Sequence, residues 1–193
     1  QQAAGTWRAL RQVDPRTRRI GIMGLGELGR DAAEKMLPLE FDIASWSRSP
    51  KDMSGITSYD GHVSFDAFLA RTDILICLLP LTDATRGIIN SANLAKLPEG
   101  AVVINCARGA HVVDDDLLAA LDADHIAGAC LDVFNEEPLP ADHRYWSHPK
   151  VRITPHTASL TNAHSAGEYV AENIRRVERG EPPLNIVDLD AGY

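Results

Sequence analysis

Three groups in the second half of the sequence are suited to acid–base chemistry on a small anionic substrate. Arg108, the acidic pair Glu136-Glu137 and His156 each come after a short apolar run that is typical of a buried strand. Open parallel sheets bind ligands beyond the carboxyl ends of their strands, so these groups are expected to meet at one edge. A guanidinium there would hold a carboxylate and polarise a carbonyl, and an imidazole would supply a proton. A neighbouring carboxylate would orient the imidazole and raise its pKa. The combination predicts hydride transfer to a keto acid.

Each of these side chains also has a structural interpretation. Arg108 could cap a strand end or pair with an acid in the cluster 114–116, the glutamates could be solvated loop residues, and His156 could be a structural histidine. His111 is interpreted as a structural residue first and an accessory residue of the site second. The other histidines are interpreted as surface or packing residues; they are His62, His125, His143, His148 and His164.

A glycine motif near the start of the chain predicts a dinucleotide site. Gly24, Gly26 and Gly29 have the spacing G-x-G-x-x-G, with Glu27 and Leu28 between them, directly after an apolar run and at the start of a helical pattern. The first glycine permits a tight turn, the second lets a pyrophosphate approach the backbone, and the third lets helix and strand pack closely. The N–H groups and the dipole at the helix start attract phosphate. The alternative is an ordinary structural turn.

The residues after the second expected strand predict NADP as the cofactor, with NAD less favoured. A site selective for NAD places an acid there, about 20 residues beyond the glycines, to accept from the ribose hydroxyls. This sequence has Ser47, Arg48 and Ser49, and Asp42 comes too early in the strand. Arg48 is suited to pair with a 2′-phosphate, and the two serines to donate to it. The alternative is a solvated loop arginine.

Composition excludes several classes of protein. The chain has 193 residues and a formal net charge of −8, with 45% hydrophobic residues. This is about one domain with enough apolar residues for a core. An acidic chain is a poor candidate for binding nucleic acid or an anionic membrane, and no apolar run is long enough to span a membrane. There is no basic start followed by an apolar stretch, so no signal peptide is expected. The chain starts at Gln1 without a methionine, and we expect a fragment or a processed chain.

The cysteines predict a reducing compartment. Cys77, Cys106 and Cys130 lie in apolar runs and form no close pair, which is typical of buried, reduced thiols. No cluster of Cys and His has the spacing of a metal site, so no metal is predicted. A cytoplasmic location is expected.

Strand and helix patterns alternate along the chain and predict a doubly wound parallel sheet, a Rossmann-type α/β fold. Strands are expected at 20–23, 41–46, 63–64, 73–79, 101–106, 126–133 and 151–154, and helices at 27–37, 65–70, 90–97, 114–121 and 162–179. The first helix would bury the face formed by Leu28, Ala32 and Met36. An apolar stripe on the last helix is interpreted as core or subunit contact; it contains Ala166, Tyr169, Val170, Asn173, Ile174 and Val177.

Taken together in this order, the motifs resemble the D-isomer-specific 2-hydroxyacid dehydrogenases. The motifs are the glycine loop, Asn-Cys-Ala-Arg-Gly over 105–109, Leu-Asp-Val-Phe-Asn-Glu-Glu-Pro over 131–138 and Thr-Pro-His over 154–156. The likeness runs from about Ile20 to Tyr193. It is strongest to the glyoxylate/hydroxypyruvate reductase A branch, through Trp-Ser-Arg-Ser at 46–49, Ala-Arg-Gly-Ala-His-Val at 107–112 and Ala-Gly-Tyr at 191–193.

The resemblance implies a role for each residue of the site. Arg108 would bind and polarise the substrate, His156 would be the acid/base, and Glu137 its carboxylate partner, since the family places this glutamate directly before the proline. Arg108 and His156 are implied to contact the cofactor as well. Further cofactor contacts implied are Asp132 at the nicotinamide carboxamide, Leu79 and Pro80 at the adenosine half, and Cys106 and Ala107 beside the nicotinamide. The chain departs from the family pattern at Thr157 and Asp115.

The resemblance also implies a domain plan and an activity. We expect a lead-in segment at 1–18, a dinucleotide-binding domain at 19–156, and at 157–193 the C-terminal return of a substrate domain whose larger, N-terminal part is absent from the sequence. The implied activity is NADPH-dependent reduction of glyoxylate or hydroxypyruvate by a homodimer, and this chain alone is expected to be weakly active or inactive. One alternative is another D-2-hydroxyacid dehydrogenase, such as one acting on phosphoglycerate. The other is a non-catalytic protein that senses nicotinamide nucleotides.

Overall fold

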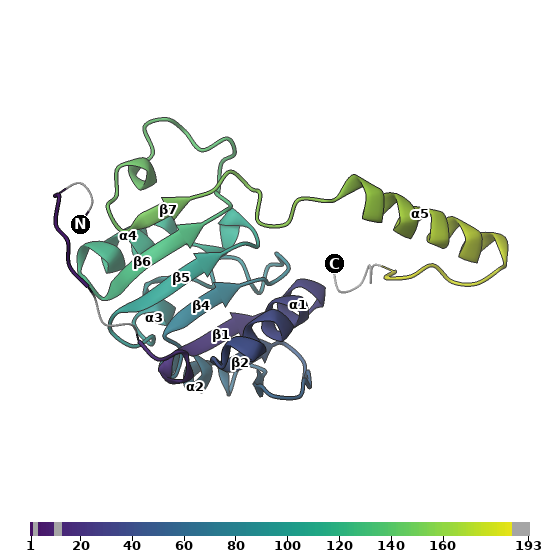
Figure 1. Ribbon diagram of the computed structural model, residues 1–193, viewed down its shortest axis with the longest axis horizontal. Coiled ribbons are helices and arrows are strands. Elements are labelled where there is room, and N and C mark those ends of the chain that lie inside the picture. Colours follow the sequence, from purple (N-terminus) through teal and green to yellow (C-terminus); the bar gives the residue numbers. More distant parts are fainter. Residues whose placement is uncertain (2–3, 10–12, 187–193) are drawn as a thin grey trace.

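A parallel sheet of seven strands forms the centre of the computed structural model, which describes residues 1, 4–9 and 13–186 (Figure 1). The strands are β1 (Arg19–Met23), β2 (Asp42–Ser47), β3 (Thr57–Asp60), β4 (Ile74–Cys77), β5 (Ala101–Asn105), β6 (Ile126–Leu131) and β7 (Val151–Ile153). Their order across the sheet is β3-β2-β1-β4-β5-β6-β7, and every neighbouring pair is parallel. The predicted doubly wound α/β fold is confirmed.

The order of the strands reverses at β1, which pairs with β2 on one side and with β4 on the other. In sheets of this kind the ligand crevice lies beyond the carboxyl ends of the strands at that reversal. The loop after β1 therefore starts at the place where a nucleotide is expected to bind.

Helices cover both faces of the sheet and bury two apolar clusters. The helices are α1 (Glu27–Met36), α2 (Phe65–Ala70), α3 (Ser91–Leu94), α4 (Asp114–Asp122) and α5 (Ala163–Glu178), and the short 3-10 turns are η1 (Pro15–Thr17), η2 (Leu37–Leu39), η3 (Gly109–His111) and η4 (Arg144–Trp146). Ala33 of α1 packs with Ile20, Ile22 and Ile43 in the smaller cluster, and α2, α3 and α4 contribute to the larger one. None of these helices is both long and apolar enough to cross a membrane, within the residues described.

Two predicted elements are wrong in place or length. The strand expected at 63–64 is absent from the structure: Val63 lies fully exposed in the turn before α2, and the third strand is β3. β3 is a polar edge strand that pairs only with β2, so it has no apolar run to mark it. The helix expected at 90–97 is only α3, which Asn90 caps by accepting from the N–H of Asn93.

The buried face of α1 also differs from the expectation. Gly29 and Ala33 are its buried residues, whereas Leu28 is 50% exposed and Ala32 and Met36 are partly buried. A Cβ at Gly29 would lie 2.0 Å from the carbonyl oxygen of Gly24, so only glycine lets the helix approach the preceding loop this closely. This close approach turns Gly29 toward the sheet and Leu28 outward.

Helix α5 lies away from the sheet, at the end of an extended segment (Figure 1). Its apolar stripe is exposed at Tyr169, Val170, Ile174 and Val177, so the interpretation of the stripe as core is wrong for this structure. These residues line an open groove of about 400 Å³ together with Asn173 and Glu178.

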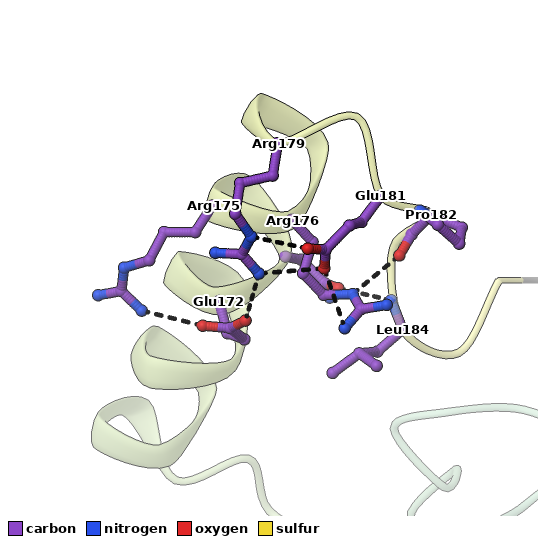
Figure 2. A network of polar contacts seen from close by, with 8 residues as sticks. Glu172, Arg175, Arg176, Arg179, Glu181, Pro182 and Leu184 are labelled. Atoms are coloured by element: carbon purple, nitrogen blue, oxygen red, sulfur yellow. Dashed lines mark hydrogen bonds and ion pairs between the residues drawn. The ribbon is translucent and has the colours of Figure 1, made fainter.

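The segment after α5 returns along the helix, and charged side chains of the two contact each other (Figure 2). Arg179 donates to Glu172 at 3.3 Å and to Glu181 at 2.9 Å, and the N–H of Leu184 donates to Asn173 Oδ1 at 2.7 Å. The ion pairs are solvent-exposed, so each contributes little to stability alone.

Candidate active site

The three residues predicted to do chemistry lie at the carboxyl ends of adjacent strands. Arg108 follows β5, Glu137 follows β6 and His156 follows β7, and these strands are neighbours in the sheet. Their loops also touch: a Cβ at Gly109 would lie 1.9 Å from the backbone carbonyl carbon of Phe134. Glycine at this position therefore lets the arginine loop pack directly against the glutamate loop.

Glu137 and His156 form the central contact of the site. Nδ1 of His156 lies 2.7 Å from Oε2 of Glu137, and Oε1 of Glu137 accepts from the N–H of Phe134 at 2.9 Å. The hydrogen bond with His156 holds the pKa of Glu137 below its ordinary value, and the positive charge of Arg108 lowers that pKa further. Glu137 therefore stays ionised in mildly acidic solution, and it keeps the imidazole oriented there.

Asp132 fixes the turn that carries His156. Burial raises its pKa, but the hydroxyl of Thr154 and the N–H groups of Ala158 and Thr157 all donate to its carboxylate, and the pKa is low overall. The N–H of His156 also donates to the carbonyl of Asp132 at 2.8 Å. These bonds hold His156 at φ 56°, a left-handed conformation that non-glycine residues seldom adopt. The carboxylate implied to contact the nicotinamide thus also positions His156.

Arg108 is exposed, with its backbone held in place and its side chain near the loop that contains Glu137. Its Nη1 donates to the carbonyl of Ala107 at 2.6 Å. Two acids of the cluster suggested as a structural partner are engaged elsewhere: Asp114 accepts from Tyr145 Oη at 3.0 Å, and Asp116 accepts from the N–H of Ser91. The arginine charge therefore remains directed to the surface at the site.

The predicted phosphate loop has the geometry that its glycines require. Gly24 adopts φ +100°, and a Cβ there would lie 2.7 Å from the carbonyl oxygen of Leu78. A Cβ at Gly26 would meet no atom within 4 Å, so open space faces the loop. Gly26 is also the N-cap of α1 and gives the helix no side-chain cap, which leaves the helix start suited to an anion. Glu27 and Leu28 are exposed in the first turn.

The residues predicted to choose the cofactor lie beside this loop. Ser47 is the last residue of β2, and its Oγ accepts from the N–H of Leu25 at 3.3 Å, which ties the glycine loop to the second strand. Ser47 is buried, while Arg48 and Ser49 are exposed beyond the strand end. Arg48 therefore lies on the same edge of the sheet as the glycine loop.

The remaining predicted contacts lie between these two groups, beyond β4 and β5. Leu79 and Ala107 bury their side chains in the larger cluster, so only their backbone can face a ligand. Pro80 lies beyond β4, and Cys106 lies beyond β5, where burial raises the pKa of its thiol.

Sequence reasoning gave no role in the site to Asn105, which is fully buried at the end of β5. Its side chain donates to the carbonyl of Arg108 at 2.9 Å and accepts from the N–H of Ala107 at 3.1 Å. The one feature of the sequence that could have indicated this role is a polar residue at the end of an apolar strand.

Two glycine substitutions should separate folding from nucleotide binding. Gly29→Ala should lower the free energy of unfolding by about 1–3 kcal/mol, because its Cβ collides with backbone. Gly26→Ala should leave stability unchanged, because its Cβ meets open space, yet weaken NADPH binding by filling that space. The checks are denaturant unfolding and an NADPH titration of both variants.

The control for this prediction is Gly167→Ala on α5, where a Cβ also meets no atom within 4 Å. This change should be neutral or stabilise by up to about 1 kcal/mol, as alanine does in helices, and leave binding unchanged. Unchanged NADPH affinity in Gly26→Ala would contradict the assignment of this loop to phosphate.

Comparison with known proteins agrees with this geometry. The family model for the D-isomer specific 2-hydroxyacid dehydrogenase, NAD binding domain, matches residues 1–158. Glyoxylate/hydroxypyruvate reductase A of Photorhabdus laumondii is 42% identical over 193 residues, which is all of this chain but 62% of that protein. The chain thus spans less than two thirds of this relative.

Solved structures of similar proteins share the fold closely. A D-isomer specific 2-hydroxyacid dehydrogenase from Xanthobacter autotrophicus Py2, in complex with NADPH and MES, is 44% identical with a TM-score of 0.96 and covers 100% of this chain and 79% of its own. The NADPH-dependent glyoxylate/hydroxypyruvate reductase of Sinorhizobium meliloti, in complex with NADP and sulfate, is 42% identical with a TM-score of 0.95 and covers 100% of this chain and 62% of its own. Sequence, fold and the order of the site residues lead to one assignment: the chain belongs to the D-isomer-specific 2-hydroxyacid dehydrogenase family.

Proposed function

We propose that this chain carries the NADPH site and the catalytic residues of a reductase of small 2-keto acids, with glyoxylate or hydroxypyruvate as substrate. The observation that carries the proposal is the 2.7 Å contact between His156 Nδ1 and Glu137 Oε2, beside the loop of Arg108. A keto acid needs a cation for its carboxylate and a proton donor for its carbonyl oxygen, and these residues supply both.

His156 is the proton donor in this proposal. Because its Nδ1 donates to Glu137, its Nε2 is the nitrogen that holds the transferable proton. The contact with the imidazole lowers the pKa of Glu137, so the carboxylate stays ionised and able to orient His156. Arg108 binds the substrate carboxylate and draws electron density from the carbonyl through its guanidinium.

The residues of the glycine loop fit a dinucleotide. Open space at Gly26, the uncapped start of α1 and the close packing at Gly29 are what a bound pyrophosphate requires. A reduced nicotinamide supplies the hydride when it is bound. The other proposed cofactor contacts are Glu27, Leu28, Leu79, Pro80, Cys106, Ala107 and Asp132.

Arg48 would select NADPH over NADH. It follows β2 beside the glycine loop, where an acid would favour NAD. Two similar proteins carry NADPH or NADP in their structures. Ser47 and Ser49 would add hydroxyl donors to the 2′-phosphate, and the absence of an acid at 47–49 disfavours a phosphoglycerate dehydrogenase that uses NAD.

Arg48→Ala should erase this preference. The loss of one charge-assisted contact should weaken NADPH binding roughly 10- to 100-fold and leave NADH binding within about twofold. The measurement is a parallel titration of this chain with both nucleotides, with Arg175→Ala on α5 as the control. Equal binding of NADPH and NADH by the unmodified chain would refute the selectivity.

The domain boundaries remain part of this proposal: a lead-in at 1–18, the dinucleotide domain at 19–156 and the return segment at 157–193. The exposed stripe of α5 supports the last, because an apolar helix face without a covering layer is typical of a contact with further protein. A homodimer is proposed on the family likeness. A cytoplasmic location is proposed because Cys77, Cys106 and Cys130 are free thiols, which is typical of a reducing compartment.

The rival from another class is a sensor of nicotinamide nucleotides that does not turn over substrate. It would bind NADPH and show the same effects of Arg48→Ala. Oxidation of NADPH by glyoxylate or hydroxypyruvate, catalysed by the protein expressed from its complete gene, separates the two. Binding without any such turnover would favour the sensor.

A further inference from the structure

His111 is a buried imidazole that joins two loops of the candidate site. The residue is 0% exposed and ends the 3-10 turn that follows Arg108. Its Nδ1 lies 3.2 Å from the backbone nitrogen of Arg108, and its Nε2 lies 3.3 Å from the carbonyl oxygen of Pro80. The side chain therefore bridges the loop after β5 and the loop after β4.

The partners of His111 assign its tautomer. Nδ1 lies 3.2 Å from the backbone nitrogen of Arg108, from which it would accept, and 3.1 Å from the carbonyl oxygen of Arg108, to which it would donate. The carbonyl of Pro80 can only accept, so Nε2 must carry the hydrogen. Burial lowers the pKa of His111 and outweighs the contacts with the backbone of Pro80 and Arg108, which raise it; the charges of Arg108 and Arg86 lower it further. The neutral form with hydrogen on Nε2 satisfies both contacts at neutral pH.

These contacts hold the backbone of Arg108 from both sides. His111 accepts from its N–H, and Asn105 donates to its carbonyl oxygen at 2.9 Å. The direction in which the Arg108 side chain leaves the backbone is therefore fixed, although the side chain itself is exposed. Pro80 is held in turn, since its carbonyl also accepts from the hydroxyl of Thr85 at 2.8 Å.

We propose that His111 is a positioning residue for substrate binding, which sets the direction of Arg108 relative to the loop after β4 through its two ring nitrogens. This inference rests on the proposed function of Arg108. A misdirected guanidinium would bind the keto acid carboxylate less well, and the KM for the keto acid would carry most of the effect. The hydrogen bonds of His111 go to Arg108 and Pro80, whereas His156 bonds to Glu137, so the proton transfer itself would change little.

Three variants of His111 test separately the contact with the Arg108 N–H and the contact with the Pro80 carbonyl. Steady-state kinetics and thermal unfolding are measured on each variant. His111→Phe keeps the ring and removes both contacts. His111→Asn places an acceptor near Nδ1, and His111→Gln places a donor near Nε2. In His111→Phe we expect kcat/KM for the keto acid to fall about tenfold, mainly through KM, which is the effect of one lost hydrogen bond. His111→Asn should recover to within about threefold of the unmodified protein, and His111→Gln should recover less.

His125→Phe is the matched control. His125 is partly buried, whereas His111 is fully buried, and it also contacts a carbonyl, that of Leu94 at 2.9 Å; it lies just before β6, at the amino ends of the strands. This variant should lose stability comparably and keep its KM. Equal KM values in His111→Phe and in the unmodified protein, or an equal rise in His125→Phe, would overturn the inference.

A readout without substrate separates this inference from the proposed function. Nitrogen NMR of the unmodified chain should show His111 neutral at neutral pH, with hydrogen on Nε2. The Arg108 amide should exchange with solvent faster in His111→Phe and His111→Gln than in His111→Asn. A neutral His111 ring with its hydrogen on Nδ1, or an Arg108 amide whose exchange rate is unchanged in all three variants, would overturn the positioning role whether or not keto acids are reduced. Absent turnover with these NMR results intact would instead refute the proposed function.

Discussion

His156→Asn should lower kcat for keto acid reduction by about 10²- to 10⁴-fold, the range that removal of a general acid produces. Asparagine suits this position, because His156 adopts φ 56° and asparagine enters the left-handed region more readily than most residues. The Asp132 contacts that hold the turn do not involve the imidazole. The fold and NADPH affinity should therefore survive, and the loss should appear in the chemical step.

The measurement is kcat for glyoxylate and hydroxypyruvate, with NADPH binding and thermal unfolding on the same preparation. His164→Asn is the control, since His164 lies exposed on α5 and pairs with Glu168 there. It should have the activity of the unmodified protein. A kcat in His156→Asn within threefold of normal would remove His156 from the chemistry and favour a structural histidine.

Arg108→Gln should reduce kcat/KM for the keto acid by about 10²- to 10³-fold, as the loss of a charged group at a polarised carbonyl does. Within the residues that the structure describes, the guanidinium donates to the adjacent Ala107 carbonyl, so little folding energy depends on it. NADPH affinity and thermal stability should stay close to normal. Arg108→Lys should recover only part of the loss, because an ammonium cannot bind a carboxylate in two parallel contacts.

Arg144→Gln is the control for this change, because Arg144 is an exposed arginine that pairs with Asp122. Both KM and kcat are needed, since Arg108 is assigned to binding and to polarisation. If Arg108→Gln and Arg144→Gln behaved alike, Arg108 would be a surface charge and the substrate would bind elsewhere.

The sequence predicts the buried parts of the sheet well, for a physical reason. β1, β4, β5 and β6 lie in the interior of the sheet with helices or loops on their faces, so they appear as continuous apolar runs. The positions of the candidate site residues could be predicted from the strands, because each of these residues comes just after the carboxyl end of one. Spacing alone left Glu136 and Glu137 equivalent, and the structure shows that Glu137 is the one in contact with His156.

Other features depend on contacts that a linear pattern does not encode. β3 is polar because it forms the edge, and the buried face of α1 is set by the collision that any side chain at Gly29 would suffer. His111 is recognisable as part of the site only when Pro80, 31 residues earlier, is seen beside it. The carboxylate of Asp132 reaches Thr157 and Ala158 across 25 and 26 residues.

The most direct test of the proposed function is the rate of NADPH oxidation with glyoxylate and with hydroxypyruvate, by the protein expressed from its complete gene. NADH with each substrate, and NAD with phosphoglycerate, are run in parallel. The proposal predicts turnover with NADPH and one or both keto acids, and much slower rates with NADH. Turnover of phosphoglycerate with NAD, or NADPH binding with no reduction of either keto acid, would contradict it.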